Sequence, residues 1–107
     1  MQWVRIFDGQ AQAAQILQDD EPKLLVVHGK RICLVMRGDT FYAVQDKCTH
    51  NGDSLSKGKV NYLGEVICPW HNYRFDLQSG RESSTRSADL ITYPLKIDEA
   101  GFFVGIF

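Results

Sequence analysis

The chain has 107 residues and a formal net charge of −1, with 44% hydrophobic and 23% charged residues. This length and composition fit one small globular domain, and the near-neutral charge argues against nucleic acid as a partner, because phosphate binding requires a basic face. The most apolar stretch, residues 23–36, is too short and too interrupted to cross a membrane. The N-terminus lacks the plan of a signal peptide and three cysteines cannot pair evenly, so we expect a cytoplasmic protein.

The first elements predicted in chain order are a strand and the one helix that the sequence indicates. Residues 3–7 alternate as a strand, with Trp3 expected in the core. Asp8 is expected to cap a helix over residues 10–17. At helical spacing three apolar residues share one side of this helix: Ala13, Ile16 and Leu17. Pro22 ends this region.

Strand signals continue to residue 45. Residues 24–27 and 32–36 are predicted to form a hairpin that turns at residues 28–30, with Cys33 as a buried structural thiol. The turn after Met36 leads into a further strand over residues 40–45, which is rich in β-forming residues.

From Asp46 to Gly80 the strand signals shorten and glycines recur, which indicates a loop-rich insert. Strands are expected again over residues 90–97 and 102–106, joined by a hairpin loop at residues 98–101. The pattern therefore predicts an all-β fold with one short helix. We expect a single domain over residues 1–107, with a subdomain at roughly 46–80 that contains the candidate functional residues.

Four residues with metal-binding side chains lie in that insert as two pairs. Cys48 and His50 come first, and Cys68 and His71 follow after seventeen intervening residues. Such a set could close a tetrahedral zinc site or hold a two-iron cluster. Zinc modules usually pair Cys with Cys and His with His, whereas the order Cys–His–Cys–His suits a cluster with both cysteines on one iron and both histidines on the other.

Residues 48–58 and 65–76, with the Gln78-Ser79-Gly80 turn and the Tyr93-Pro94-Leu95 strand, resemble the Rieske ferredoxins of bacterial multicomponent oxygenases. The resemblance implies a small antiparallel β-sandwich with an inserted cluster-binding subdomain. It implies one Rieske-type 2Fe-2S cluster per chain, held by Cys48, His50, Cys68 and His71. It also implies that the exposed edges of the two histidines form the electron exit, and that residues 82–89 form a third, shielding loop.

The resemblance also bears on the reduction potential. Neutral imidazoles leave the oxidised cluster uncharged, so adding an electron costs less than in an all-cysteine cluster. Quinol-oxidising Rieske proteins have a disulfide where this chain has Asp53 and Trp70, and they place hydroxyl groups toward the cluster where it has Tyr73 and Phe75. With fewer hydrogen bonds to sulfur, we expect a potential near the low end of the Rieske range, about −150 mV.

The leading functional hypothesis is a soluble one-electron carrier between a flavin-dependent reductase and a terminal oxygenase. No catalytic constellation is present, so the chain itself is not expected to be an enzyme. Two alternatives are the small subunit of an assimilatory nitrite reductase and a zinc-stabilised interaction module. Four basic residues are expected around the ligand loops, either to steer an acidic partner or as an ordinary solvated rim: Lys47, Lys57, Lys59 and Arg74.

Overall fold

The computed structural model describes residues 1–70 and 72–107. Within them the strands form three antiparallel sheets of three strands each. The first sheet has the order β1 (Gln2–Phe7), β9 (Gly101–Ile106) and β8 (Leu95–Asp98). The second consists of β2 (Lys23–Val27), β3 (Lys30–Arg37) and β4 (Thr40–Gln45). The third consists of β5 (Lys59–Val60), β6 (Glu65–Ile67) and β7 (Arg74–Asp76).

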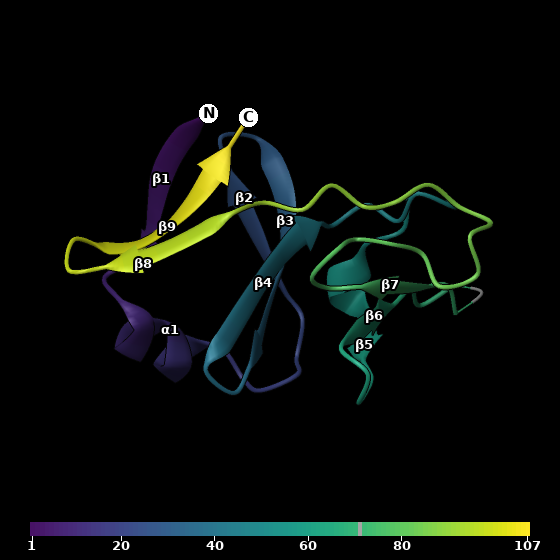
Figure 1. The fold of residues 1–107 in the computed structure, drawn as a ribbon, viewed down its shortest axis with the longest axis horizontal. Coiled ribbons are helices and arrows are strands. Elements are labelled where there is room, and N and C mark those ends of the chain that lie inside the picture. Colours follow the sequence, from purple (N-terminus) through teal and green to yellow (C-terminus); the bar gives the residue numbers. More distant parts are fainter. Residues whose placement is uncertain (71) are drawn as a thin grey trace.

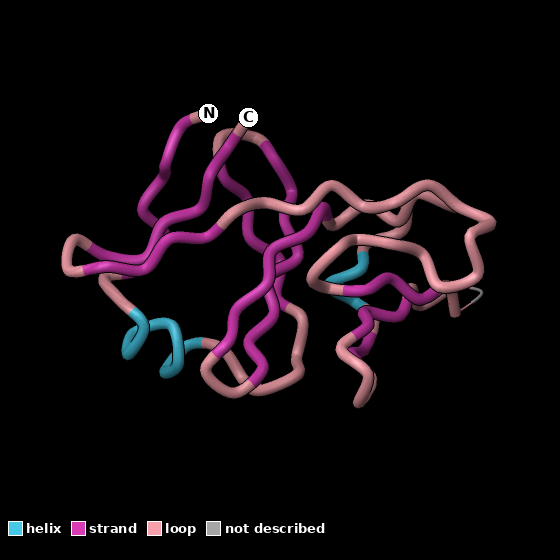
Figure 2. The backbone as a smooth tube through the Cα atoms, in the orientation of Figure 1, coloured by secondary structure: helices cyan, strands magenta, loops and turns pink. Residues whose placement is uncertain are grey.

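One α-helix, α1 (Gln10–Ile16), and one 3-10 helix, η1 (Leu55–Lys57), complete the elements of the described residues. The first two sheets and α1 make up the base of the molecule, and residues 46–89 form a tip beside it (Figure 1). Loops dominate the tip, whereas strands dominate the base (Figure 2). The expected all-β class with one short α-helix is confirmed. No helix in the described part of the chain is long and apolar enough to span a membrane.

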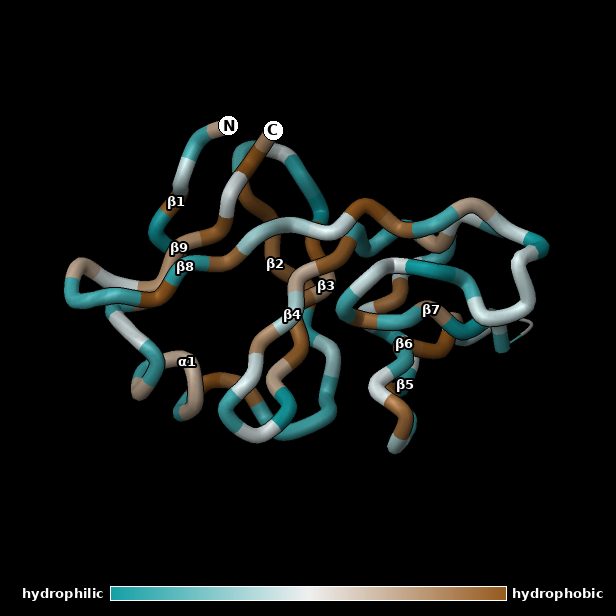
Figure 3. The backbone as a smooth tube through the Cα atoms, viewed as in Figure 1, coloured by the Kyte–Doolittle hydropathy of each residue, from teal (hydrophilic) through white to brown (hydrophobic). Residues whose placement is uncertain are grey.

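The β2-β3-β4 sheet separates two hydrophobic clusters, because side chains on a strand alternate between its faces. On β3, Ile32 and Leu34 join the cluster of the base, while Cys33 and Val35 join the cluster under the tip. All four are buried, which explains why this strand reads as an unbroken apolar run. Hydrophobic stretches follow β2, β3 and β9 through the base (Figure 3). One face of the central sheet thus packs against the tip.

The first strand departs from simple alternation. The pairing of β1 with β9 shifts between Arg5 and Phe7, so a bulge breaks the period. Regular alternation would place Trp3 and Arg5 on the same face as Phe7, but Phe7 is buried whereas Trp3 and Arg5 are exposed. The prediction of Trp3 as a core residue is wrong: its side chain is 37% exposed and packs under the ammonium group of Lys96, 4.9 Å from the ring centroid.

The helix also differs from the prediction in two details. Gly9, not Asp8, occupies the N-cap position, and no side chain caps the helix there. The Asp8 carboxylate instead accepts hydrogen bonds from Arg5, at 2.7 Å, and from Gln12, at 3.3 Å. Of the α1 residues expected to share an apolar side, only Ala13 is buried, whereas Ile16, at the end of the helix, is 48% exposed.

The strand predicted over residues 90–97 is only partly present, because the regular strand covers Leu95–Asp98. The preceding residues run beside β4, where Tyr93 donates its backbone N–H to Ala43, and form a single bridge between Val44 and Thr92. Pro94 has no N–H, and its carbonyl accepts a bond from Gly105 in the other sheet. Residues 90–94, the return segment, therefore change sheets at this proline.

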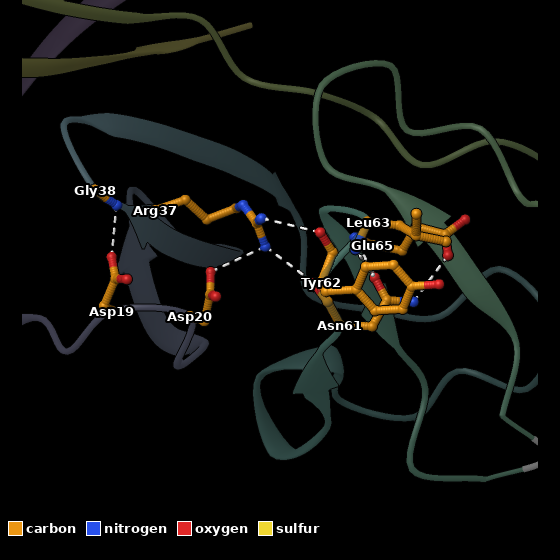
Figure 4. Close-up of polar contacts among 8 residues, drawn as sticks. All are labelled: Asp19, Asp20, Arg37, Gly38, Asn61, Tyr62, Leu63 and Glu65. Atoms are coloured by element: carbon orange, nitrogen blue, oxygen red, sulfur yellow. Dashed lines mark hydrogen bonds and ion pairs between the residues drawn. The ribbon is translucent and has the colours of Figure 1, made fainter.

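Arg37, at the end of β3, ties the base to the tip (Figure 4). Its guanidinium group donates to the carbonyl oxygens of Asn61, at 2.9 Å, and Tyr62, at 3.3 Å. It also forms an ion pair with Asp20 at 3.0 Å. The amide of Asn61 in turn fixes its own turn through bonds to Leu63 and Glu65. One planar side chain thus connects three segments: the end of β3, the turn at residues 61–62 and the loop that contains Asp20.

Replacing Arg37 by Ala is expected to lower the free energy of unfolding by about 2 kcal/mol, because two backbone carbonyls and a partly buried carboxylate lose a charged donor. Urea denaturation measures this loss. Arg81→Ala is the matched control, because the Arg81 side chain is exposed and has no ion pair within the described residues. The control should stay within about 0.5 kcal/mol of the parent protein, and equal losses in both variants would contradict the linking role of Arg37.

Candidate metal centre

The first loop of the tip is anchored by a buried carboxylate. Asp46 directly follows β4, is 1% exposed and accepts hydrogen bonds from the Ser54 hydroxyl, at 2.5 Å, and the Ser56 backbone N–H, at 2.8 Å. Arg31 on β3 lies 3.6 Å from the same carboxylate. Because a buried charge requires such partners, Asp46 fixes both ends of the loop that contains Cys48 and His50.

Within this loop the backbone closes on itself around Cys48. The Cys48 N–H donates to the carbonyl of Asp53, and the Gly52 N–H donates to the carbonyl of Cys48, each at 2.8 Å. Gly52 has a φ of 80°, a conformation that favours glycine. The turn holds the Cys48 thiol buried, while His50 remains exposed.

The second loop joins β6 to β7 and begins with Cys68. The Cys68 N–H donates to the carbonyl of Tyr73 at 2.8 Å, which closes the loop at its base. Cys68 is fully buried, whereas the side chain of Trp70 is 61% exposed. The fourth predicted ligand, His71, lies outside the described residues.

Three contacts bring the two loops together. The buried thiol groups of Cys48 and Cys68 belong to one hydrophobic cluster and are close enough for Cys48 to raise the pKa of Cys68. The Cys68 thiol also donates to the amide oxygen of Asn51 at 3.7 Å. The ring of His50 stacks on that of Tyr73, with centroids 4.0 Å apart and planes 9° from parallel. Two cysteines distant in sequence therefore share one buried position.

The sulfur pair has the chemistry of a cation site. Burial raises the pKa of the Cys68 thiol, and the neighbouring Cys48 raises it further, because two thiolates at this distance would repel each other. A metal ion between the sulfurs would remove that repulsion. The donor set therefore fits iron bound by two thiolates. Among the residues described, no three His, Cys, Asp or Glu side chains form a metal site by themselves.

Cys33 differs from this pair, although it too is buried. It lies on β3 in the cluster under the tip. Burial raises the pKa of its thiol, and the nearby Asp46 carboxylate raises it further. The expected burial of Cys33 is confirmed.

A third segment of the tip covers the first loop. The Thr49 hydroxyl lies 2.6 Å from the Ser87 hydroxyl and donates to the carbonyl of Ala88, also at 2.6 Å. The guanidinium carbon of Arg86 lies 5.2 Å from the centroid of the Tyr73 ring. Residues 86–88 thus pack against both loops, in agreement with the expected shielding segment.

This segment is shaped by a second buried carboxylate, Glu82, which is 1% exposed. It accepts hydrogen bonds from the backbone N–H and hydroxyl of Ser84 and from the N–H of Arg86. Burial alone would raise the pKa of Glu82, but these donors and the charge of Arg86 outweigh it and lower the pKa. The carboxylate holds residues 82–86 in a tight turn.

Replacing Glu82 by Gln is expected to destabilise the protein only where the carboxylate is ionised. Because folding lowers the pKa of Glu82, its contribution is present above the unfolded pKa, about 4.3, and is lost as the pH falls through the folded value. The difference in unfolding temperature between the parent and the variant should therefore be full at neutral pH and vanish toward acidic pH. Glu99→Gln, on an exposed hairpin turn, is the control and should show no such trend. A pH-independent difference would contradict the role of the charge.

Sequence reasoning missed the residues that join the loops. Asn51 and Tyr73 touch the predicted ligands, and Thr49 fastens the covering segment. The resemblance drew attention to Tyr73 only as a position not expected to supply a hydrogen bond to sulfur, and gave no sign of its stacking on His50. No spacing rule marks Asn51, since its contact depends on how the two loops approach.

Comparison with known proteins gives the family. The model of the Rieske [2Fe-2S] domain matches residues 8–94. The 3-phenylpropionate/cinnamic acid dioxygenase ferredoxin subunit of Escherichia coli (strain K12) is 33% identical over 76 residues, which cover 70% of this chain and 72% of that protein. Among solved structures, the ferredoxin of carbazole 1,9a-dioxygenase from Nocardioides aromaticivorans IC177 has a TM-score of 0.81 at 25% identity, covering 97% of each chain.

A protein assigned as the small subunit of an NADH-dependent nitrite reductase from Mycobacterium tuberculosis is also similar in fold. It has a TM-score of 0.79 at 19% identity, with 96% of this chain and 93% of that one covered. At this identity the likeness concerns the fold alone. The family match, by contrast, spans both loops that bring the buried sulfurs together. The chain therefore belongs to the Rieske [2Fe-2S] domain family.

Proposed function

We propose that the chain is a one-electron carrier whose Rieske-type 2Fe-2S cluster is held by Cys48, His50, Cys68 and His71. The observation that supports this most directly is the burial of the Cys48 and Cys68 thiols in one cluster, although they come from two separate loops of the matched domain. In this proposal the two thiolates bind one iron and the two imidazoles bind the other. The bound cluster would supply reversible one-electron chemistry.

The chain's own residues set the conditions for that chemistry. Burial of Cys48 and Cys68 excludes water from the sulfur side, and the Asn51 amide is placed to contact the Cys68 sulfur. His50 lies on the exposed side, where its ring is oriented by stacking on Tyr73. An electron would therefore leave through the histidine side, because the cysteine side is covered by protein.

The partners that we propose are a flavin-dependent reductase as donor and a terminal oxygenase as acceptor. The relative from Escherichia coli is named as the ferredoxin subunit of a dioxygenase, which supports this choice over a nitrite reductase. We place the protein in the cytoplasm, because three cysteines cannot pair evenly into disulfides. We also propose a single domain over residues 1–107. The third sheet, and the hydrophobic cluster that it shares with the central sheet, support a subdomain near residues 46–80.

Anaerobic purification followed by iron and sulfide analysis tests the proposal. We expect two iron and two acid-labile sulfide per chain, a red-brown colour that bleaches with dithionite, and a midpoint potential of about −150 mV. A colourless, zinc-containing protein without sulfide would overturn the carrier role. A midpoint potential above about +100 mV would contradict only the expected low potential and not the carrier role, since the Rieske range extends beyond that value.

A further inference from the structure

A cavity of about 300 Å³ opens beside Cys68, on the side of β5 and β6. Gly58 lies in its wall, and six side chains complete the lining: Lys57, Lys59, Ile67, Cys68, Pro69 and Asn72. The cavity therefore combines two cationic side chains with the backbone around a proposed cluster ligand. No part of the proposed electron carrier chemistry requires these lysines.

The backbone that carries the two lysines is held firmly in place. Lys59 pairs with Ile67 across β5 and β6, and the Gly58 N–H donates to the carbonyl of Leu55 at 2.9 Å. Gly58 also packs so closely on Ile67 that an added Cβ would meet its carbonyl oxygen at 1.9 Å. Because the backbone is held in place, the Cα positions of the two lysines beside the cavity are fixed.

Charge in the tip is unevenly distributed between interior and surface. Residues 46–89 contain six Lys or Arg and six Asp or Glu residues. Two of the acids, Asp46 and Glu82, are buried and already hydrogen-bonded, whereas Lys57 and Lys59 are exposed. Within the described residues neither lysine forms an ion pair. The surface of the tip is therefore positive, although the whole chain has a formal charge of −1.

We propose that this cavity is a docking point for a redox partner protein, which inserts a surface Asp or Glu carboxylate between Lys57 and Lys59. Charge complementarity would steer the partner toward the tip and fix its orientation on the loop that contains Cys68 and the proposed ligand His71. The inference rests on the proposed electron carrier role and adds to it the chemistry of the partner's surface. The base, which contains most of the exposed acids, would face away from the partner.

The test compares Lys57→Glu/Lys59→Glu with a control of equal charge change, Lys23→Glu/Lys96→Glu, whose residues are exposed on β2 and β8 of the base. Each dithionite-reduced holoprotein is mixed with ferricyanide at low ionic strength, with or without hexaglutamate as a model acidic surface. In the parent protein, we expect hexaglutamate to slow reoxidation. The tip variant should react with ferricyanide about tenfold more slowly than the parent and lose sensitivity to hexaglutamate.

The control should stay within about twofold of the parent and keep its inhibition by hexaglutamate, because its charges lie on the base and not on the tip. Equal slowing in both variants, or inhibition that persists in the tip variant, would overturn the docking point while the carrier role stands. A parent protein without a dithionite-bleachable chromophore would instead show that the carrier role itself has failed.

Discussion

Replacing Cys68 or Cys48 by Ala is expected to abolish cluster binding, so that the variants are purified colourless and without acid-labile sulfide. The two thiols are buried in one cluster, and in either variant the remaining sulfur cannot by itself supply the two thiolates that one ferric iron requires. Metal binding is coupled to folding, so the tip should also become less stable. Iron and sulfide content and visible absorption measure the first effect, and proteolysis of the tip measures the second.

Cys33 offers a matched control inside the same molecule. It is as buried as the other two cysteines and belongs to the same hydrophobic cluster, but it points from β3 into the core. Cys33→Ala should cost about 1 kcal/mol of stability through the lost packing, while iron and sulfide remain at the level of the parent. Full iron in Cys68→Ala, or loss of iron in Cys33→Ala, would contradict the proposed ligand set.

The sequence was informative where local chemistry decides the structure. The strand over residues 40–45 begins and ends as predicted, because β-forming residues are bounded by a glycine turn and by Asp46. The hairpin at residues 28–30 is present as well, with both His28 and Gly29 at positive φ, as a tight turn of this kind requires. Such features depend on neighbours in the chain, so a pattern of residue types can predict them.

Features that depend on distant contacts could not be predicted in this way. The return segment has the composition of a strand throughout, but it leaves one sheet for another at Pro94. Trp3 alternates correctly with its neighbours, yet it lies on the outer face because a bulge follows it. The stacking of His50 on Tyr73 likewise arises from the approach of two loops, and no spacing within either loop encodes that distance.

The packing of Gly58 leads to the second prediction of large effect. In Gly58→Ala the new Cβ would lie 1.9 Å from the carbonyl oxygen of Ile67 and 3.2 Å from that of Leu55. The φ of Gly58 is −87°, which alanine adopts readily, so the effect is purely steric. Both obstacles are backbone atoms, so β6 must move away just before Cys68. We expect a loss of about 3 kcal/mol in the free energy of unfolding and a lower iron content.

Gly9→Ala separates this steric effect from a general cost of replacing glycine. Gly9 is extended, with a φ of 175°, and an added Cβ there would meet nothing within 4 Å. Its substitution should cost less than about 1 kcal/mol, the cost of a poorer N-cap, and leave the iron content unchanged. Urea denaturation and iron analysis of both variants decide the matter. If Gly58→Ala were as stable and as rich in iron as Gly9→Ala, then close packing of Gly58 on β6 would not be what positions Cys68.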